Sequence, residues 1–193
     1  MINSSCNWLS AITAAAALSS ISFAAQAANV NIVDTTGTAG ITNVAAATDG
    51  IIPPDFTEWT TDSAYWTGFG ETLTLKFDQA YYLSSLTLTA DWNDYYTVSV
   101  STDDISYVDL GTYTGIGSPV NFGQVTLPVA LAPSPTAFSF AKVTAVLGGD
   151  GSNSVGEISF QGVTAAVPEP ETYAMLLAGL GVVGFMGKRR RAS

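Results

Sequence analysis

Residues 72–77 read Thr-Leu-Thr-Leu-Lys-Phe, with a large apolar side chain at every second position. Side chains on a β-strand point alternately to the two faces of a sheet, so this period of two predicts a strand with one face in a core and the other in water. The same alternation returns in residues 86–89 (Leu-Thr-Leu-Thr) and 96–100 (Tyr-Thr-Val-Ser-Val). These stretches therefore predict antiparallel sheets that are covered on one side only.

Three further strand-like runs follow, at residues 120–127, 137–147 and 155–161, and Gly, Pro, Asn and Asp separate the runs from one another. No stretch between residues 30 and 161 keeps a helical period, and we find no internal repeat. Seven or eight short strands with regular turn signals are typical of a β-sandwich or jelly roll. The sequence therefore predicts one all-β, antiparallel domain over residues 28–166.

Charge and composition exclude several classes of function. The chain has 193 residues, 6 Lys+Arg, 16 Asp+Glu, no His and one Cys, with a net charge of −10. Residues 28–166 hold 14 of the acidic residues and only two bases, Lys76 and Lys142, so this part carries −12. A nucleic-acid partner is not expected, because phosphate binding needs a basic face. Without His, the usual zinc sites and Ser-His-Asp chemistry are excluded as well.

The N-terminal residues 1–27 have the features of a secretory signal peptide. An apolar stretch is followed by Ala25-Gln26-Ala27, the small-x-small pattern at which signal peptidase cuts. The segment lacks the Lys or Arg that usually precedes the apolar run. Since Cys6 lies inside it, we expect the mature protein to contain no cysteine and therefore no disulfide.

The C-terminal residues 167–193 have the features of a second targeting signal. Pro168, Glu169 and Pro170 precede an apolar run over residues 173–187, and four basic residues follow at 188–191. This order predicts a short transmembrane helix with its basic end in the cytoplasm. Fifteen helical residues cover only about 22 Å, less than the roughly 30 Å of a bilayer core.

This succession resembles the PEP-CTERM sorting signal. The resemblance implies a Gram-negative bacterium that makes exopolysaccharide, and cleavage near Pro168-Glu169-Pro170 by an exosortase after only transient contact of residues 173–187 with the membrane. It places the mature protein in the cell envelope, on the outer surface or in the extracellular matrix. The alternative is an ordinary C-terminal anchor behind a proline-rich linker.

The middle of the chain resembles the discoidin-type domain (coagulation factor five/eight C-terminal type). This galactose-binding-like jelly roll is shared with many carbohydrate-binding modules. The resemblance covers about residues 43–162, but Asp104 stands where Gly is usual, Lys142 is the only base near the strand that normally carries Arg, and the bridging cysteines are absent. The phrases that carry it, in order, are Asp49-Gly50 with Thr57-Glu58-Trp59, Trp66 before residues 73–77, residues 96–103 with Tyr107, and Gly149-Asp150 before Val155-Gly156-Glu157-Ile158.

The discoidin resemblance also implies a structural Ca²⁺. Asp49, Thr57 and Glu157 match the side-chain ligand positions of the family, and backbone carbonyls of residues 44–52 would complete the shell. Calcium needs six to eight oxygen ligands, and an acidic domain favours a cation. The alternative is that Asp49-Gly50 forms an ordinary turn and that Glu157 is a solvated strand residue.

A glycan site is predicted at Trp92, Asn93, Asp94 and Tyr95, a cluster that falls at the junction of a strand and a loop. Sugars stack their apolar C–H faces on aromatic rings, while their hydroxyls bond to Asp, Asn and backbone groups. Aromatic rings fill cores more often than they bind ligands. We expect Trp59, Trp66 and Tyr96 to do so here.

Two acidic pairs, Asp91 with Asp94 and Asp103 with Asp104, raise the possibility of a glycoside hydrolase. Such an enzyme needs two carboxyl groups at a set separation and one raised pKa, whereas adjacent strand residues point to opposite faces. We therefore expect a non-catalytic module that binds a polysaccharide or an envelope glycan. The alternative is a structural or adhesive surface protein of the biofilm matrix without a specific sugar site.

Overall fold

The computed structural model describes residues 26–114, 123–148, 150–165 and 176–181. This part of the chain contains nine β-strands, a short 3-10 helix and a helical stretch at 176–181, where the sequence pattern predicted seven or eight strands. The elements are β1 (Ala28–Asn29), β2 (Ile32–Gly37), η1 (Val44–Thr48), β3 (Ala64–Thr67), β4 (Thr72–Asp91), β5 (Asp94–Ser101), β6 (Tyr107–Thr114), β7 (Gln124–Ala130), β8 (Phe138–Gly148) and β9 (Ser152–Thr164).

The 20-residue strand β4 joins the two layers of the fold. Its first part, residues 72–77, pairs with β2 and β8, and β8 continues through β5 to β6. Its second part, residues 81–91, pairs with β9 and β7, and β9 also pairs with β1 and β3. All of these pairs are antiparallel. We call the two layers the large sheet (β2, β4, β8, β5, β6) and the small sheet (β7, β4, β9, β1, β3).

Sequence alternation predicted two strands at residues 72–77 and 86–89, and the structure shows one continuous strand. The pairing of β4 with β8 shifts between Lys76 and Tyr81, where the strand leaves the large sheet and enters the small one. Asp78 at this corner accepts hydrogen bonds from Tyr81 Oη at 2.7 Å and from Asn31 Nδ2 at 3.2 Å. Polar residues at 78–79 therefore mark a bend between the sheets and not a break in the strand.

The hydrophobic core lies between the two sheets. The alternating residues Leu73, Leu75, Val98 and Val100 are all 0% exposed, as the sequence pattern predicted. Rings of the two layers meet edge to face, with centroids 6.4 Å apart for Trp66 on β3 and Tyr96 on β5. Complete burial of one such aliphatic or aromatic side chain contributes about 1.5–3 kcal/mol.

Three rings that could line the core or a site lie in different places. Trp66 and Tyr96 are buried in the core, as expected, whereas Trp59 is only half-buried and packs edge-on against Tyr65, with ring centroids 5.5 Å apart. The prediction that Trp59 is a core residue is therefore confirmed only in part. Its ring covers the outside of the small sheet instead.

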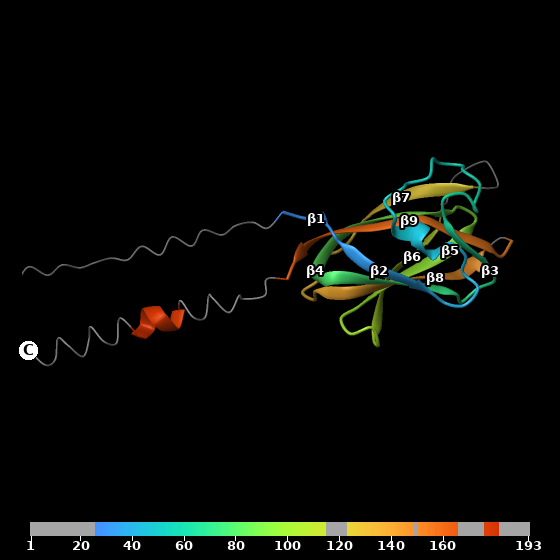
Figure 1. Cartoon of the computed structure of the whole chain (residues 1–193). Helices are drawn as coiled ribbons and strands as arrows, with labels where there is room; N and C mark the ends of the chain where they lie inside the picture. The colour runs from blue at the N-terminus through green and yellow to red at the C-terminus, as the bar shows by residue number, and fades with distance from the viewer. Residues whose placement is uncertain (1–25, 115–122, 149, 166–175, 182–193) are drawn as a thin grey trace, which may run out of the picture.

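The described ends of the sandwich, residues 26 and 165, lie at the same end of the molecule (Figure 1). Within the predicted apolar helix 173–187, residues 176–181 are helical and exposed. No helix in the described part of the chain is long and apolar enough to cross a membrane. The processing motif Pro168-Glu169-Pro170, the basic tail 188–191 and nearly all of the signal peptide fall outside the described residues.

Candidate functional site

The predicted glycan residues lie at the end of the sandwich opposite the chain termini. On β4, Tyr81 pairs with Thr164 near the termini, and Ala90 pairs with Val155 at the other end. The next residues form the tight turn from β4 into β5, with Trp92 and Asn93 at its tip. A hairpin tip at the end of a rigid sandwich is a position from which side chains can reach a ligand.

Two of the turn residues offer polar atoms that the described residues leave unused. Trp92 and Asn93 are each half-buried, and neither the indole Nε1 of Trp92 nor the Oδ1 of Asn93 has a hydrogen-bond partner there. Tyr95 is 40% exposed at the start of β5. The turn thus presents the ring of Tyr95 at its surface, while the Trp92 donor and the Asn93 acceptor lie buried just beneath it.

Asp94 occupies a different place from the one the sequence suggested. Its exposed fraction is 0%, so direct contact with a surface ligand does not fit its position. The side chain lies close enough to Asp91 and Tyr96 for its charge to act on both groups. Asp94 therefore belongs to the support of the turn and not to its outer surface.

The carboxyl group of Asp91 in this turn has a strongly raised pKa. It is 3% exposed, and burial raises its pKa to about 7, with further contributions from the negative charges of Asp94 and Asp150. The backbone amides of Trp92 and Asn93 oppose this rise. Asp91 thus holds the turn by hydrogen bonds to its amides, at the cost of a carboxylate in a poorly solvated position.

The neighbouring strands complete the support of the turn. Asp91 pairs with Gln124 on β7, and the register of β4 and β9 places Ser154 on its other side. Ser154 and Gln124 are 0% exposed, and the amide of Ser154 donates to Tyr96 Oη at 2.9 Å. Burial also raises the pKa of Tyr96 well above its ordinary value, so this hydroxyl stays neutral.

The other acidic pair lies in the turn between β5 and β6. Asp103 Oδ1 accepts hydrogen bonds from the amides of Ile105 and Ser106 and from Ser101 Oγ, each at 2.9 Å. These three hydrogen bonds lower the pKa of Asp103, and the bond from the Ser106 amide has the largest effect. Asp104 has a φ of 62° and accepts a hydrogen bond from Tyr107 Oη. A lowered pKa is the opposite of what an acid catalyst needs, so this pair is a structural turn.

Two of the three predicted calcium ligands lie close together on the outside of the small sheet. Asp49 follows η1, and the next amide, that of Gly50, donates to Glu157 Oε2 at 3.1 Å. Burial raises the pKa of Glu157 to about 7, the Gly50 amide opposes the rise, and the charge of Asp49 adds to it. Bringing two carboxylates together in this way favours a cation between them.

Thr57, the third predicted ligand, has its hydroxyl engaged locally. Its Oγ1 donates to the Pro54 carbonyl at 2.6 Å, and its own carbonyl accepts the Gln124 amide at 2.9 Å. Gly156 on β9 lies directly beneath this loop, because a Cβ there would lie 2.8 Å from Pro53 Cγ and 2.0 Å from Gln124 Oε1. The loop from 49 to 63 is thereby fixed over β9, with Thr57 in a turn of its own.

The residues fit a calcium ion in part. Asp49 also forms the turn that was the alternative interpretation, since its Oδ1 accepts the Ile51 amide at 2.8 Å. No group of three or more Asp, Glu, Cys or His side chains that could hold a metal occurs among the described residues. A Ca²⁺ here would therefore combine two carboxylates with backbone carbonyls and water.

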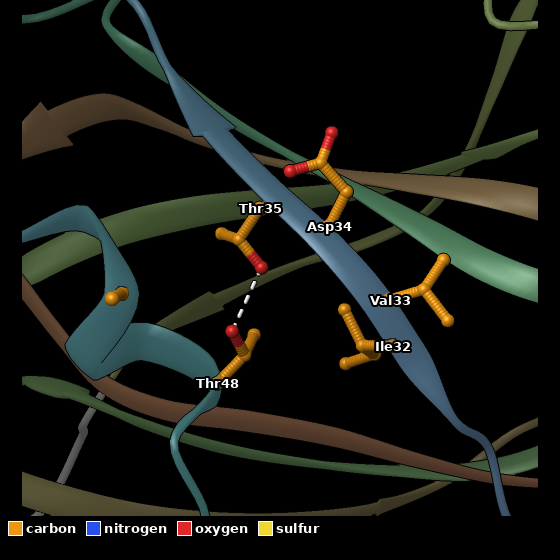
Figure 2. Close-up of a pocket in the computed structure, with 6 residues that line it drawn as sticks. Ile32, Val33, Asp34, Thr35 and Thr48 are labelled. Carbon is orange, nitrogen blue, oxygen red and sulfur yellow. Dashed lines mark hydrogen bonds between the residues drawn. The ribbon is translucent and has the colours of Figure 1, made fainter.

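A shallow crevice of about 280 Å³ lies between β2 and η1, at a side of the sandwich that sequence patterns did not single out (Figure 2). Ile32 and Ala45 form part of its wall, and the hydroxyls of Thr35 and Thr48 meet across it at 2.7 Å. Since these hydroxyls already bond to each other, the crevice serves chiefly to join η1 to the edge strand β2.

Exposed apolar groups beside Tyr95 enlarge the candidate glycan surface. The loop that contains Phe69 is bound to β8 by the amide of Gly70, which donates to the Ala145 carbonyl at 3.0 Å. Phe69 is 47% exposed and Val146 is 45% exposed. Val146 directly follows the core residue Ala145, so the alternation of the strand directs its side chain outward.

The C-terminus matches a model of the PEP-CTERM protein-sorting motif over residues 166–191. Among curated proteins no sequence matches the chain.

Solved structures of family 32 carbohydrate-binding modules (CBM32) resemble the sandwich. The CBM32 of AlyQ, in complex with 4,5-unsaturated mannuronic acid, has a TM-score of 0.54 at 15% identity and covers 69% of this chain and 97% of its own. The family 32 module of C. perfringens NanJ, in complex with galactose, has 0.50 at 15%, with 66% and 92% covered.

A third such structure is CBM32-1 from a family 31 glycoside hydrolase of Clostridium perfringens. It has a TM-score of 0.50 at 14% identity and covers 68% of this chain and 96% of its own. At such low identity the likeness establishes the fold. The chain thus carries a PEP-CTERM protein-sorting motif behind an antiparallel β-sandwich with the discoidin-like fold of these modules.

Proposed function

We propose that this protein is an exported, exosortase-processed and non-catalytic module that binds carbohydrate or exopolysaccharide at the cell surface or in the extracellular matrix. One observation carries the proposal. At the β4–β5 turn a half-buried tryptophan and a 40%-exposed tyrosine, Trp92 and Tyr95, lie beside two buried polar atoms, Trp92 Nε1 and Asn93 Oδ1, that have no hydrogen-bond partner among the described residues.

The chemistry of the turn suits a sugar. The rings of Trp92 and Tyr95 offer apolar faces for the C–H face of a pyranose. The indole N–H and the Asn93 carbonyl are buried, so they would pair with ring-edge hydroxyls only after a small opening of the turn. A buried donor or acceptor without a partner is unfavourable by about 1–3 kcal/mol, so a ligand that satisfies these atoms gains affinity. That two structurally similar modules were solved with galactose and with unsaturated mannuronic acid supports this ligand class.

Hydrolysis is not part of the proposal. The acid with a pKa raised to about 7, Asp91, is almost wholly buried beside the fully buried Asp94. The exposed acid in the other turn, Asp103, has a lowered pKa. A glycosidase needs two carboxyl groups that both reach the substrate.

The proposal includes a structural Ca²⁺ at Asp49 and Glu157. The ion would fix η1 and the loop after it to β9, a link now made by the bond from the Gly50 amide to Glu157. Export would use signal peptidase after residue 27 and exosortase at Pro168-Glu169-Pro170, with residues 173–187 in the membrane for the time of processing. The similarity of residues 166–191 to the sorting motif supports this route.

The test is direct binding of the purified chain to neutral and acidic bacterial polysaccharides, first with calcium and then with a chelator. Tyr95→Ala should weaken saturable binding about tenfold, while Tyr82→Ala should not. Tyr82 is a matched control, because it is 42% exposed and pairs with Val163 near the opposite end of the sandwich.

The outcomes separate the candidate functions. Binding that resists the chelator would remove Ca²⁺ from the proposal and leave the glycan site. Absence of binding to every glycan would favour the adhesive alternative, for which Ile51, Ile52 and Phe56 offer a loop of half-exposed apolar side chains. Reproducible release of a cleaved sugar would overturn the non-catalytic assignment.

A further inference from the structure

The outer face of the large sheet carries both bases of the sandwich domain. Lys76 lies on β4 and Lys142 on β8, and their flanking residues Leu75, Ala141 and Val143 face the core with 0% exposure. The side chains of the two lysines therefore project outward from the same sheet. In a domain whose other charges are all negative, this face is where an anion is least repelled.

Lys142 is held in place by its neighbours. Its Nζ lies 3.8 Å from the centre of the Tyr107 ring. Ser99 separates it from Asp109, whose carboxylate already accepts the Ser99 hydroxyl at 2.9 Å. An ammonium over a ring keeps free donors for an incoming carboxylate. Lys76 differs, because Asp34 lies opposite it on β2 and offsets its charge.

A row of hydroxyls crosses the same face one step toward the candidate glycan turn. The row runs from Thr72 through Thr144 and Thr97 to Thr112, on four adjacent strands. Its members bond in pairs, Thr72 to Thr144 at 3.1 Å and Thr97 to Thr112 at 2.9 Å. The Thr97–Thr112 pair uses one proton and so keeps a donor and acceptors toward solvent. Thr72 Oγ1 also donates to the Gly70 carbonyl at 3.4 Å, so the Thr72–Thr144 pair offers acceptors. With strands about 4.8 Å apart, the row spans about 14 Å.

The next step along β8 and β5 reaches the exposed groups Val146 and Tyr95, with Phe69 beside them. From Val146 to Lys142 the strand covers about 14 Å. The face thus presents, in order, apolar and aromatic groups, a row of hydroxyls, and a lysine on a tyrosine ring. We call this path, Tyr95 and Val146 through Thr97 and Thr144 to Lys142, the outer platform.

We infer that the outer platform binds an extended polysaccharide that bears carboxylates, a uronate chain, with one sugar stacked at Tyr95 and a carboxylate at Lys142. The inference rests on the proposed glycan-binding function and specifies its ligand. A neutral chain would use the rings and hydroxyls but would gain nothing from Lys142. A uronate chain uses all three, and the acidity of the remaining surface confines it to this face.

The experiment uses the purified chain with polygalacturonate and with the same polymer after full methyl esterification, which removes the charge and keeps the backbone. The wild-type chain should bind the charged polymer more tightly, with weaker binding at high salt. Lys142→Gln should weaken binding of the charged polymer about fivefold and abolish the preference. Lys76→Gln, which changes the net charge equally, should leave the affinity for the charged polymer and the preference for it nearly unchanged.

A second pair of variants tests the hydroxyl row. Thr144→Val should weaken binding of both polymers, whereas Thr87→Val, a half-buried threonine on the small sheet, should weaken neither. Thermal unfolding of each variant verifies the fold.

Equal affinity for both polymers, or equal losses in the two lysine variants, overturns the inference. Binding of another glycan through Trp92 without any affinity for polygalacturonate overturns it and leaves the proposed function. Binding of no glycan at all overturns both.

Discussion

Strand β5 begins and ends in an acidic turn, and the two turns differ in almost every physical respect. At its start, Asp91 and Asp94 are buried, and the pKa of Asp91 is raised to about 7. At its end, Asp103 is exposed and its pKa is lowered, since one carboxylate oxygen accepts three hydrogen bonds. The same residue type thus serves a poorly solvated turn and an exposed turn that is rich in hydrogen bonds.

The difference teaches where function is to be sought in this molecule. The β5–β6 turn satisfies its own polar groups and needs nothing from outside. The β4–β5 turn leaves Trp92 Nε1 and Asn93 Oδ1 without partners in the described structure, and it rests on the buried carboxyl group of Asp91, whose raised pKa makes the ionised form destabilising. Such unfavourable groups are retained where the binding of a ligand compensates for their free-energy cost.

The largest expected effect concerns binding at the β4–β5 turn. Trp92→Ala removes the ring and its donor, and should weaken glycan binding by about 2 kcal/mol or more, roughly thirtyfold, in calorimetric titration. Ile105→Ala in the β5–β6 turn is the control, because Ile105 is 83% exposed and lies at the far end of β5. Equal affinity of the two variants would place the site elsewhere.

The next effect is on stability. Tyr96→Phe leaves the buried amide of Ser154 without the acceptor that it now has at 2.9 Å, so the free energy of unfolding should fall by about 1–3 kcal/mol. Urea unfolding measures this change. Tyr107→Phe, at the β5–β6 turn, removes a hydrogen bond to Asp104 at an exposed position and should lower the free energy of unfolding less. A larger loss in Tyr107→Phe would reverse our ranking of the two turns.

The sequence alone was sufficient to predict the sandwich fold but not the arrangement of the candidate site. The period of two at residues 72–77 and 96–100 predicted which side chains line the core, because burial on one face requires it. It could not reveal that β4 runs on through Asp78 into the second sheet. Nor could it show that Asp94 is buried, since that depends on the strands that close over the turn.

The outer platform also lies beyond local sequence reasoning. Lys142 on β8 reaches Tyr107 on β6 across the strand β5, which lies between them in the sheet. The spacing of these residues along the chain does not reveal this strand order. Val146 lies on the outer face because it continues the alternation of Lys142 and Thr144 on β8, and the irregular pairing of β8 with β5 leaves it beside Tyr95. Long-range register is therefore what turns scattered residues into a surface.

A third expected effect is pH-dependent and distinguishes the turns directly. The raised pKa of Asp91 means that its folded-state stabilisation is full below the unfolded pKa of about 4 and is lost as pH rises toward about 7. Asp91→Asn should therefore match the wild type near pH 4 and exceed it by about 1–2 kcal/mol at pH 8. Urea unfolding across this range measures the difference, in which Glu157 contributes equally to both proteins. A difference that does not change with pH would show that Asp91 is solvated.

The smallest effect belongs to Asp103 and has the opposite sign. Its lowered pKa makes the ionised form stabilising above the unfolded pKa, and this contribution is lost as pH falls through the folded pKa. Asp103→Asn should thus unfold at a slightly lower temperature than the wild type at pH 7 and at the same temperature near pH 2. Thermal unfolding at both pH values tests this, and a variant that is more stable at pH 7 would mean that Asp103, like Asp91, is destabilising when ionised. The two turns would then share one electrostatic character, and the contrast that points to the β4–β5 turn as the binding site would disappear.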